Sequence, residues 1–124
     1  MLCSDCMRKI YDKLTKEELA VFYYIYGREK KVQEAMNSDK NANKFIRVIN
    51  DSKTISDSIC MNSNKIRETL NFFYKIGAIT RKKQDHTWNY AISTEGNVLI
   101  KYLEGDTKTL NSVINFLKEV SRHA

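Results

Sequence analysis

The fold is decided by one stretch, MNSNKIRETLNFFYKIGAI, which runs from Met61 to Ile79. Within it, Ile66, Leu70 and Phe73 follow one another at intervals of four and three residues. That spacing places three apolar side chains on one face of a helix. We therefore predict a helix over Ser63–Ile76 with a narrow buried stripe, and all other side chains of this helix outside the stripe or on its flanks.

Both ends of the predicted helix carry boundary residues. Asn62 or Ser63 can cap the first turn, because their side chains accept hydrogen bonds from the free backbone N–H groups there. Gly77 follows the last turn, where helices commonly end in a left-handed residue. A shorter helix over Thr54–Cys60, with Ile55 and Ile59 directed inward, comes just before. We expect a tight turn to join the two helices.

A hairpin is predicted next. The run Ala78–Lys83 and the run Trp88–Ser93 are separated by the polar residues Gln84–Thr87. Trp88, Tyr90 and Ile92 alternate with polar or small residues, which is the period of a half-buried strand. We expect Trp88 to pack at the base of the hairpin.

The residues before this unit are predicted to be helical. Ser4–Leu14 favours a short helix, and Thr15 with Glu18 forms a capping box for the next one. Gly27 is expected to end or loosen that second helix. The charged segment Arg28–Met36 is compatible with a further helix. The second helix carries apolar residues at helical spacing, at Leu19, Phe22, Tyr23 and Tyr26.

Three more helices are expected. Lys44–Asp51 has a strong apolar face, and a helix that opens at Thr94–Gly96 is broken at Gly105. The last helix, Thr107–Arg122, either docks on its own domain or pairs with a second copy, and we favour pairing because the other helices already suffice for a small core. Its apolar stripe consists of Leu110, Val113, Ile114, Leu117 and Val120.

Composition places the 124-residue chain among small globular proteins, with 42% hydrophobic and 29% charged residues. No apolar run approaches the roughly 20 residues that span a membrane. The first residues lack the apolar core of an export signal, so we expect a cytoplasmic protein. The formal net charge is +6. Six of the cations lie between residues 62 and 84 against the single acid Glu68, and they are Lys65, Arg67, Lys75, Arg81, Lys82 and Lys83.

The order helix, tight turn, helix, hairpin, helix resembles the winged helix-turn-helix superfamily of MarR-, ArsR- and PadR-like regulators. The stretch Ser93–Gly96 is similar to the start of the helix after the wing in such proteins, with a spacing one residue shorter. The resemblance covers roughly 50 residues and selects no single family. Six apolar or glycine positions match in register, at Met61, Ile66, Leu70, Phe73, Gly77 and Ile79.

The resemblance implies an α+β, mostly helical fold with a two-stranded wing. The whole chain, 1–124, would form one domain. Its winged-helix core would span 54–104, N-terminal helices would span 4–51, and the C-terminal helix 107–122 would be available for dimerisation.

The predicted helix would bind DNA, since an α-helix fits the major groove and its N-terminal side chains reach base edges. Asn64 and Asn71 have the donor and acceptor pair that reads adenine, and Arg67 has the fork that reads guanine. Glu68 would accept from cytosine or orient Arg67. The candidate contacts on this helix are Ser63, Asn64, Lys65, Arg67, Glu68 and Asn71.

The wing supplies the remaining candidate contacts, which we expect to be mostly to phosphates. Alternation along the strand places Arg81 and Lys83 on one face and Lys82 on the other. His86 lies at the predicted tip. These four residues complete the predicted DNA-binding set.

Three functions are consistent with these residues. The first is a transcriptional regulator that binds double-stranded DNA as a homodimer, with a small-molecule effector or a protein partner. The second is a DNA-binding adaptor of a plasmid or phage partition system, because Asn71–Ile79 is also similar to the centromere-binding proteins of tubulin-type systems. The third is a protein-binding winged helix without a DNA role, in which Phe72, Tyr74 or the final helix would form the contact.

No catalytic grouping, cofactor motif or complete metal site is predicted. Cys3 and Cys6 have the spacing of two metal ligands, but one such pair is half a site. Cys60, His86 and His123 could complete it in principle, although nothing in their spacing requires that, and a redox-active pair is an alternative for Cys3 and Cys6. We expect free thiols, with Cys60 buried in the helix 54–60, and we expect no enzymatic activity.

Overall fold

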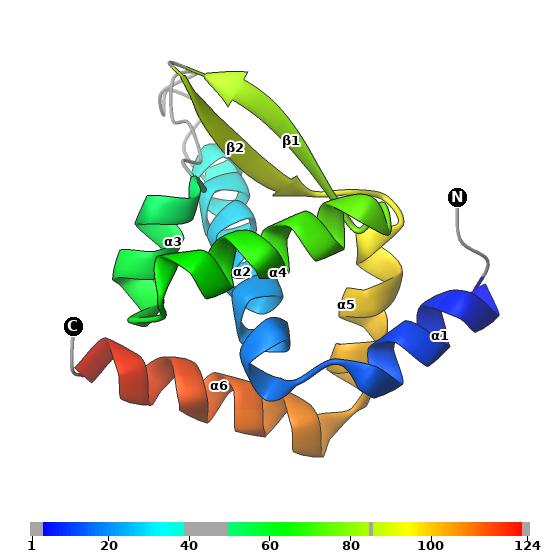
Figure 1. The fold of residues 1–124 in the computed structure, drawn as a ribbon. Coiled ribbons are helices and arrows are strands. Elements are labelled where there is room, and N and C mark those ends of the chain that lie inside the picture. The colour runs from blue at the N-terminus through cyan, green and yellow to red at the C-terminus, as the bar shows by residue number, and fades with distance from the viewer. Residues whose placement is uncertain (1–3, 39–49, 85, 123–124) are drawn as a thin grey trace.

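The computed structural model describes residues 4–38, 50–84 and 86–122 (Figure 1). The described part is mostly helical and contains one antiparallel two-stranded sheet, which confirms the predicted class. The elements are α1 (Ser4–Lys13), α2 (Lys16–Ser38), α3 (Ser52–Ile59), α4 (Ser63–Lys75), β1 (Ile79–Gln84), β2 (Thr87–Ile92), α5 (Gly96–Gly105) and α6 (Thr107–Arg122).

The core is built around the N-terminal half of α2. Phe22 and Ile25 of this helix are almost completely buried. The ring of Phe22 lies 4.8 Å from the ring of Phe73 in α4, centroid to centroid. Burying each such side chain contributes about 1.5–3 kcal/mol. This contact fixes which face of α4 points inward and which face is left for solvent.

The last helix, α6, packs across α2 on the side of the molecule opposite the hairpin (Figure 1). Val113 is fully buried, and the other apolar residues of the stripe, among them Leu110, Leu117 and Val120, are partly buried against the core. The alternative in which this stripe docks on its own chain is therefore the one that the structure shows. This contact covers one side of α2, and pairing of α6 with a second copy stays a prediction.

One predicted helix end was wrong, and one predicted helix falls mostly on residues that the structure does not describe. Gly27 does not end a helix, because α2 continues through it to Ser38. An interior glycine costs about 1 kcal/mol relative to alanine, and the buried turns before it outweigh that cost. The predicted helix over Lys44–Asp51 lies almost wholly outside the described residues. Its last residue, Asp51, is the N-cap of α3 and accepts from the N–H of Thr54.

The predicted capping signals are confirmed. Thr15 and Glu18 exchange the two hydrogen bonds of a capping box at the start of α2. Asn62 caps α4 by accepting from the N–H of Asn64 at 2.8 Å. Gly77, after α4, has φ +80° and therefore adopts the left-handed conformation that glycine tolerates best.

The hairpin is tied to the end of α4 by the segment that leads into α5. The Ser93 hydroxyl donates to the Gly77 carbonyl and accepts from the N–H of Gly96. The N–H of Ser93 also donates to the carbonyl of Ala78 at 3.1 Å. A Cβ at Gly96 would lie 2.1 Å from that same carbonyl oxygen. Only glycine lets α5 approach the start of β1 so closely, which is the physical content of the Ser93–Gly96 motif.

None of the helices in the described part of the chain combines the length and the apolar character needed to cross a membrane.

Candidate nucleic-acid interface

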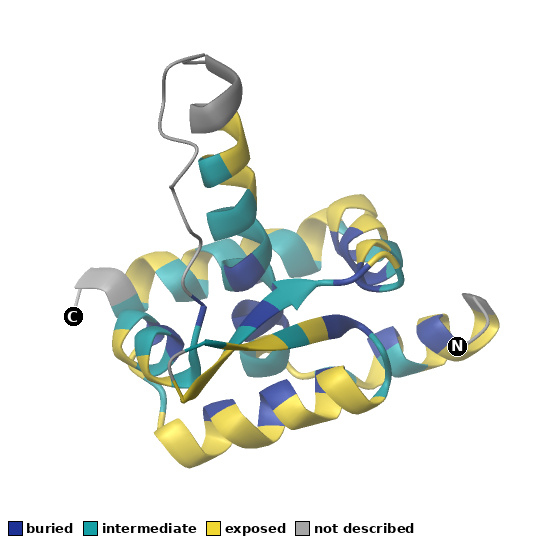
Figure 2. Ribbon diagram, turned by 90° about the horizontal axis from the view of Figure 1, so that it is seen from above, coloured by how far each residue is buried: buried dark blue, intermediate teal, exposed yellow. Residues whose placement is uncertain are grey.

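The helix α4 has one buried face and one exposed face, as the alternation along it in Figure 2 shows. Ile66, Leu70 and Phe73 are completely buried, as predicted. All six predicted contact residues of this helix are exposed, namely Ser63, Asn64, Lys65, Arg67, Glu68 and Asn71. The predicted buried stripe is therefore confirmed, and the candidate contact residues lie at the surface.

The exposed residues of α4 divide into a central row and two flanks. At 100° per residue, Asn64, Glu68, Asn71 and Lys75 lie opposite the buried stripe and form the central row. Lys75 was missing from the predicted set. Its spacing of four residues after Asn71 could have identified it, since it continues the row at helical period. The predicted set ended at Asn71, one turn before Lys75.

The flanks face different neighbours. Arg67 and Tyr74 lie on the side of the hairpin. Lys65 and Phe72 lie on the side of the α1–α2 junction, where they line a shallow groove with Glu18. The predicted set is thus brought to one surface, but Lys65 lies on the flank that faces away from the hairpin.

Arg67 is oriented by Asn64. Its guanidinium donates to the Asn64 side-chain carbonyl one turn earlier. Glu68, the residue predicted to orient it, makes no ion pair with Arg67; the described residues contain one ion pair, between Arg8 and Asp12. The reason is helix geometry: residues three apart face each other, while adjacent residues point 100° apart. Asn64 and Arg67 therefore present their polar groups together.

The hairpin places its charged residues near the tip. Lys82, Lys83 and His86 are exposed, and His86 occupies the two-residue loop with φ +70°. Arg81 is only partly exposed. The predicted division of faces is confirmed for Arg81 and Lys83, because both stack on the ring of Trp88.

Trp88 does not lie at the base of the hairpin. It pairs with Lys83, one position from the last pair of the strands, and 38% of it is exposed. Its face was correctly predicted, since Tyr90 on the same face is buried. The hairpin extends beyond the core, so residues of this face lose their cover toward the tip. The alternation in the sequence predicts which side chains share a face of the hairpin, but it does not predict how far the hairpin extends beyond the core.

The outer edge of β2 is covered by two groups that the sequence analysis missed. The N–H of Tyr90 donates to the carbonyl of Asn50 at 3.1 Å, and the N–H of Asn50 donates to the Asn89 side chain at 2.6 Å. The N–H of Ile92 donates to a carboxylate oxygen of Glu29 at 3.0 Å. No local signal could have found these contacts, since Glu29 lies 63 residues from Ile92 in the chain.

Glu29 carries the electrostatic consequence of this contact. Partial burial raises the pKa of its carboxyl above the ordinary value, and the hydrogen bond from Ile92 offsets part of that rise. Glu29 is thus a structural acid that supports the hairpin from behind.

The described residues contain no candidate metal site, because no three His, Cys, Asp or Glu side chains among them are close enough to hold one ion. Cys60 is exposed, and the prediction that it is buried was wrong. It has φ +54° at the end of α3, and this left-handed turn directs it away from the helix interior. Cys3 and His123 lie outside the described residues.

Comparisons of the chain with protein-family models, with curated proteins and with solved structures found no match.

Proposed function

We propose that this chain is a winged helix-turn-helix protein that binds double-stranded DNA, with α4 as the recognition helix and the β1–β2 hairpin as the wing. The observation that carries the proposal is the exposed face of α4. It presents amide, guanidinium and ammonium groups along a helix whose opposite face is locked into the core. A rigid helix with such a face matches the width and the hydrogen-bonding pattern of the major groove.

The arrangement around α4 supports the winged-helix assignment. A tight turn joins α3 to α4, and the hairpin follows α4 directly. Asn50, between α2 and α3, pairs with β2 through its backbone carbonyl. This hydrogen bond fixes the hairpin to the segment that leads into α3, so that the hairpin and the two helices form one unit.

The side chains divide into base readers and phosphate contacts. Asn64, Arg67 and Asn71 would contact bases, because amides and guanidinium groups make bidentate pairs with adenine and guanine. Lys82 and Lys83 would contact phosphates from the wing. Phosphate contacts fix the register of the protein on the duplex, and base contacts select the sequence.

We further propose that the protein acts as a transcriptional regulator and binds as a homodimer without enzymatic activity. This step rests on the resemblance of the sequence to winged-helix regulators. Two copies would place their recognition helices in successive major grooves, about 34 Å apart. The DNA site would then be a pseudo-palindrome.

The test is selection of a binding site from a pool of random duplexes, followed by affinity measurements at several salt concentrations. We expect one enriched pseudo-palindromic site and a salt slope of about −0.9 per phosphate contact in a log–log plot. Equal binding of all duplexes at micromolar strength would remove sequence recognition. Cooperative coating of repeated sites would favour the partition adaptor over the regulator.

A second candidate, a protein-binding role without DNA, is favoured by Phe72. This residue is 38% exposed and lines a shallow groove with Ile10 and Leu14 at the α1–α2 junction. An exposed aromatic ring beside aliphatic side chains is typical of a protein contact. If Phe72→Ser leaves DNA binding unchanged but abolishes a cellular phenotype, this second role would gain support.

A further inference from the structure

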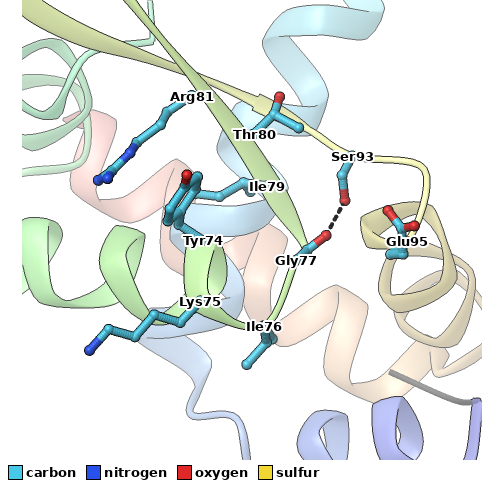
Figure 3. A pocket seen from close by; sticks show the side chains of 9 residues that line it. All are labelled: Tyr74, Lys75, Ile76, Gly77, Ile79, Thr80, Arg81, Ser93 and Glu95. Atoms are coloured by element: carbon cyan, nitrogen blue, oxygen red, sulfur yellow. Dashed lines mark hydrogen bonds between the residues drawn. The ribbon is translucent and has the colours of Figure 1, made fainter. Parts of the chain in front are cut away.

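The C-terminal end of α4 and the strand β1 enclose an open groove of about 840 Å³, which we call the corner groove (Figure 3). Its lining includes Lys75, Arg81 and Glu95, and no residue of β2. The side chains of Lys75 and Arg81 extend toward the same side of this groove, while Glu95 lies at its other end (Figure 3). The groove therefore has one cationic end.

Arg81 is held by two aromatic rings. The central carbon of its guanidinium lies 4.0 Å from the ring centroid of Tyr74 in α4 and 4.3 Å from that of Trp88 in β2. Tyr74 and Trp88 are both exposed for such large aromatic residues, with exposed fractions of 41% and 38%. A cation placed over the face of an aromatic ring at such distances is attracted by the electron density of the ring. We call these three residues the clip.

The clip leaves hydrogen-bonding capacity unused. The Nε of Arg81 is buried and has no hydrogen-bond partner among the described residues. The stacked rings satisfy the face of the guanidinium but none of its N–H groups, which lie in its plane. Because Nε is buried, a ligand in the groove would have to reach the guanidinium through its terminal N–H groups.

The backbone of β1 adds donors on the same side. The N–H groups of Tyr90 and Ile92 point away from β1, toward Asn50 and Glu29. Their partners in the ladder, Arg81 and Ile79, must then also direct their N–H groups outward, because such antiparallel pairs exchange no hydrogen bonds. Outward from β1 is the side on which the corner groove lies.

We propose that the corner groove is a phosphate-binding site, in which Tyr74 and Trp88 fix the guanidinium of Arg81 to grip one backbone phosphate of the bound duplex together with Lys75. This inference rests on the proposed DNA binding. It also gives Tyr74 and Trp88 a role: they are positioning residues that act through Arg81. A guanidinium forms two parallel hydrogen bonds to a phosphate, which a lysine cannot reproduce.

The first part of the test detects the clip in the free protein by NMR of arginine side chains. The Nε–H resonance of Arg81 should be displaced by the two rings. Tyr74→Leu should reduce this displacement, because only the Trp88 ring then remains beside the guanidinium, while Tyr74→Phe should keep it. Phe72→Leu is the matched control, because Phe72 is equally exposed on the same helix and lies outside the clip. An undisplaced resonance in the unaltered protein would show that no clip forms.

The second part measures duplex affinity of the same proteins by fluorescence anisotropy. Arg81→Lys keeps the charge but loses the planar fork, so we expect about tenfold weaker binding with a nearly unchanged salt slope. Tyr74→Leu should weaken binding by a similar factor. Tyr74→Phe and Phe72→Leu should bind the duplex as tightly as the unaltered protein. Affinity unchanged in Arg81→Lys would overturn the proposal, because charge alone would then suffice.

A third measurement separates this proposal from the DNA-binding proposal. Inorganic phosphate is titrated while the Arg81 Nε–H resonance is followed. A saturable shift that Arg81→Lys and Lys75→Ala weaken would support the phosphate site even if no duplex binds. If duplexes bind but phosphate produces no shift and Arg81→Lys is neutral, the corner groove is refuted while DNA binding stands.

Discussion

The two ends of α4 are built in different ways. At the N-terminal end, Asn64 and Arg67 are exposed, and their side chains hydrogen-bond to each other. At the C-terminal end, the carbonyl of Gly77 is bound by Ser93, and Tyr74 stacks on Arg81 of the hairpin. One end is thus free to adapt to a ligand, while the other is fixed to the hairpin.

The two ends of α4 would therefore have different roles in binding DNA. In protein–DNA complexes, contacts to phosphates set the register and contacts to base edges read the sequence. A fixed C-terminal corner with cations would set the register, and a free N-terminal end with amides and a guanidinium would read bases. Changes at the two ends should therefore have distinct consequences.

The largest effect is expected from Gly96→Ala, which breaks the fixed end. The new Cβ would collide with the backbone oxygen of Ala78, and backbone cannot move aside cheaply. We expect a loss of about 3 kcal/mol in the free energy of unfolding, measured by urea denaturation. Gly27→Ala is the control: its Cβ would meet nothing within 4 Å, so the helix should gain about 0.5–1 kcal/mol. Equal stability of Gly96→Ala and the unaltered protein would contradict the tight contact.

Next in size is the pair Lys82→Ala/Lys83→Ala, which sharpens the comparison from the side of the hairpin. Both side chains are exposed and lie near the tip. Duplex affinity should fall about tenfold, which corresponds to about 1.4 kcal/mol, because two charges that release counterions are lost. The loss should be similar for selected and random duplexes in a filter-binding or anisotropy measurement. A loss restricted to the selected sequence would assign base reading to the wing.

Asn62→Ala tests the free end. Its side chain accepts from the N–H of Asn64, and removing such a cap costs about 1 kcal/mol. Thermal unfolding should report that loss. Since the cap holds only the first turn, the Arg81 resonance at the other end should not move. A shift there would show that the two ends are coupled.

The smallest effect concerns pH and Glu29→Gln. Because the pKa of Glu29 is raised in the folded protein, its contribution to stability is present below the unfolded pKa and is lost as pH rises through the folded pKa. Glutamine keeps the acceptor for the N–H of Ile92 but has no charge. Glu29→Gln should therefore melt slightly higher than the unaltered protein at pH 7, with no difference at pH 4. A lower melting temperature at pH 7 would mean that the charge itself is stabilising.

The sequence predicted those features of the fold that depend only on residues close together in the chain. The buried stripe of α4, the capping box at Thr15 and the left-handed Gly77 were all confirmed, because each depends on residues within one or two turns. Gly27 was misjudged for the opposite reason, since burial of the preceding turns carries α2 through it. The bounds of a helix depend on propensity only where packing is weak.

The candidate interface was predictable as a surface but not as a geometry. Helical period identified which residues of α4 are exposed, and it would also have identified Lys75. The stack of Tyr74 on Arg81 could not be foreseen, because it depends on how the hairpin lies against the end of α4. Asn50 was equally out of reach, since its contact with Tyr90 joins residues 40 apart in the chain.

The most direct test of the account is a single-base substitution scan of the selected DNA site with the unaltered protein and with Arg67→Ala. We predict that Arg67→Ala lowers affinity for the selected site by about 1–3 kcal/mol and abolishes discrimination at one base pair, while discrimination at the other positions and binding to random duplexes stay nearly unchanged. Equal weakening on every duplex, or an unchanged scan, would contradict base reading by the free end of α4.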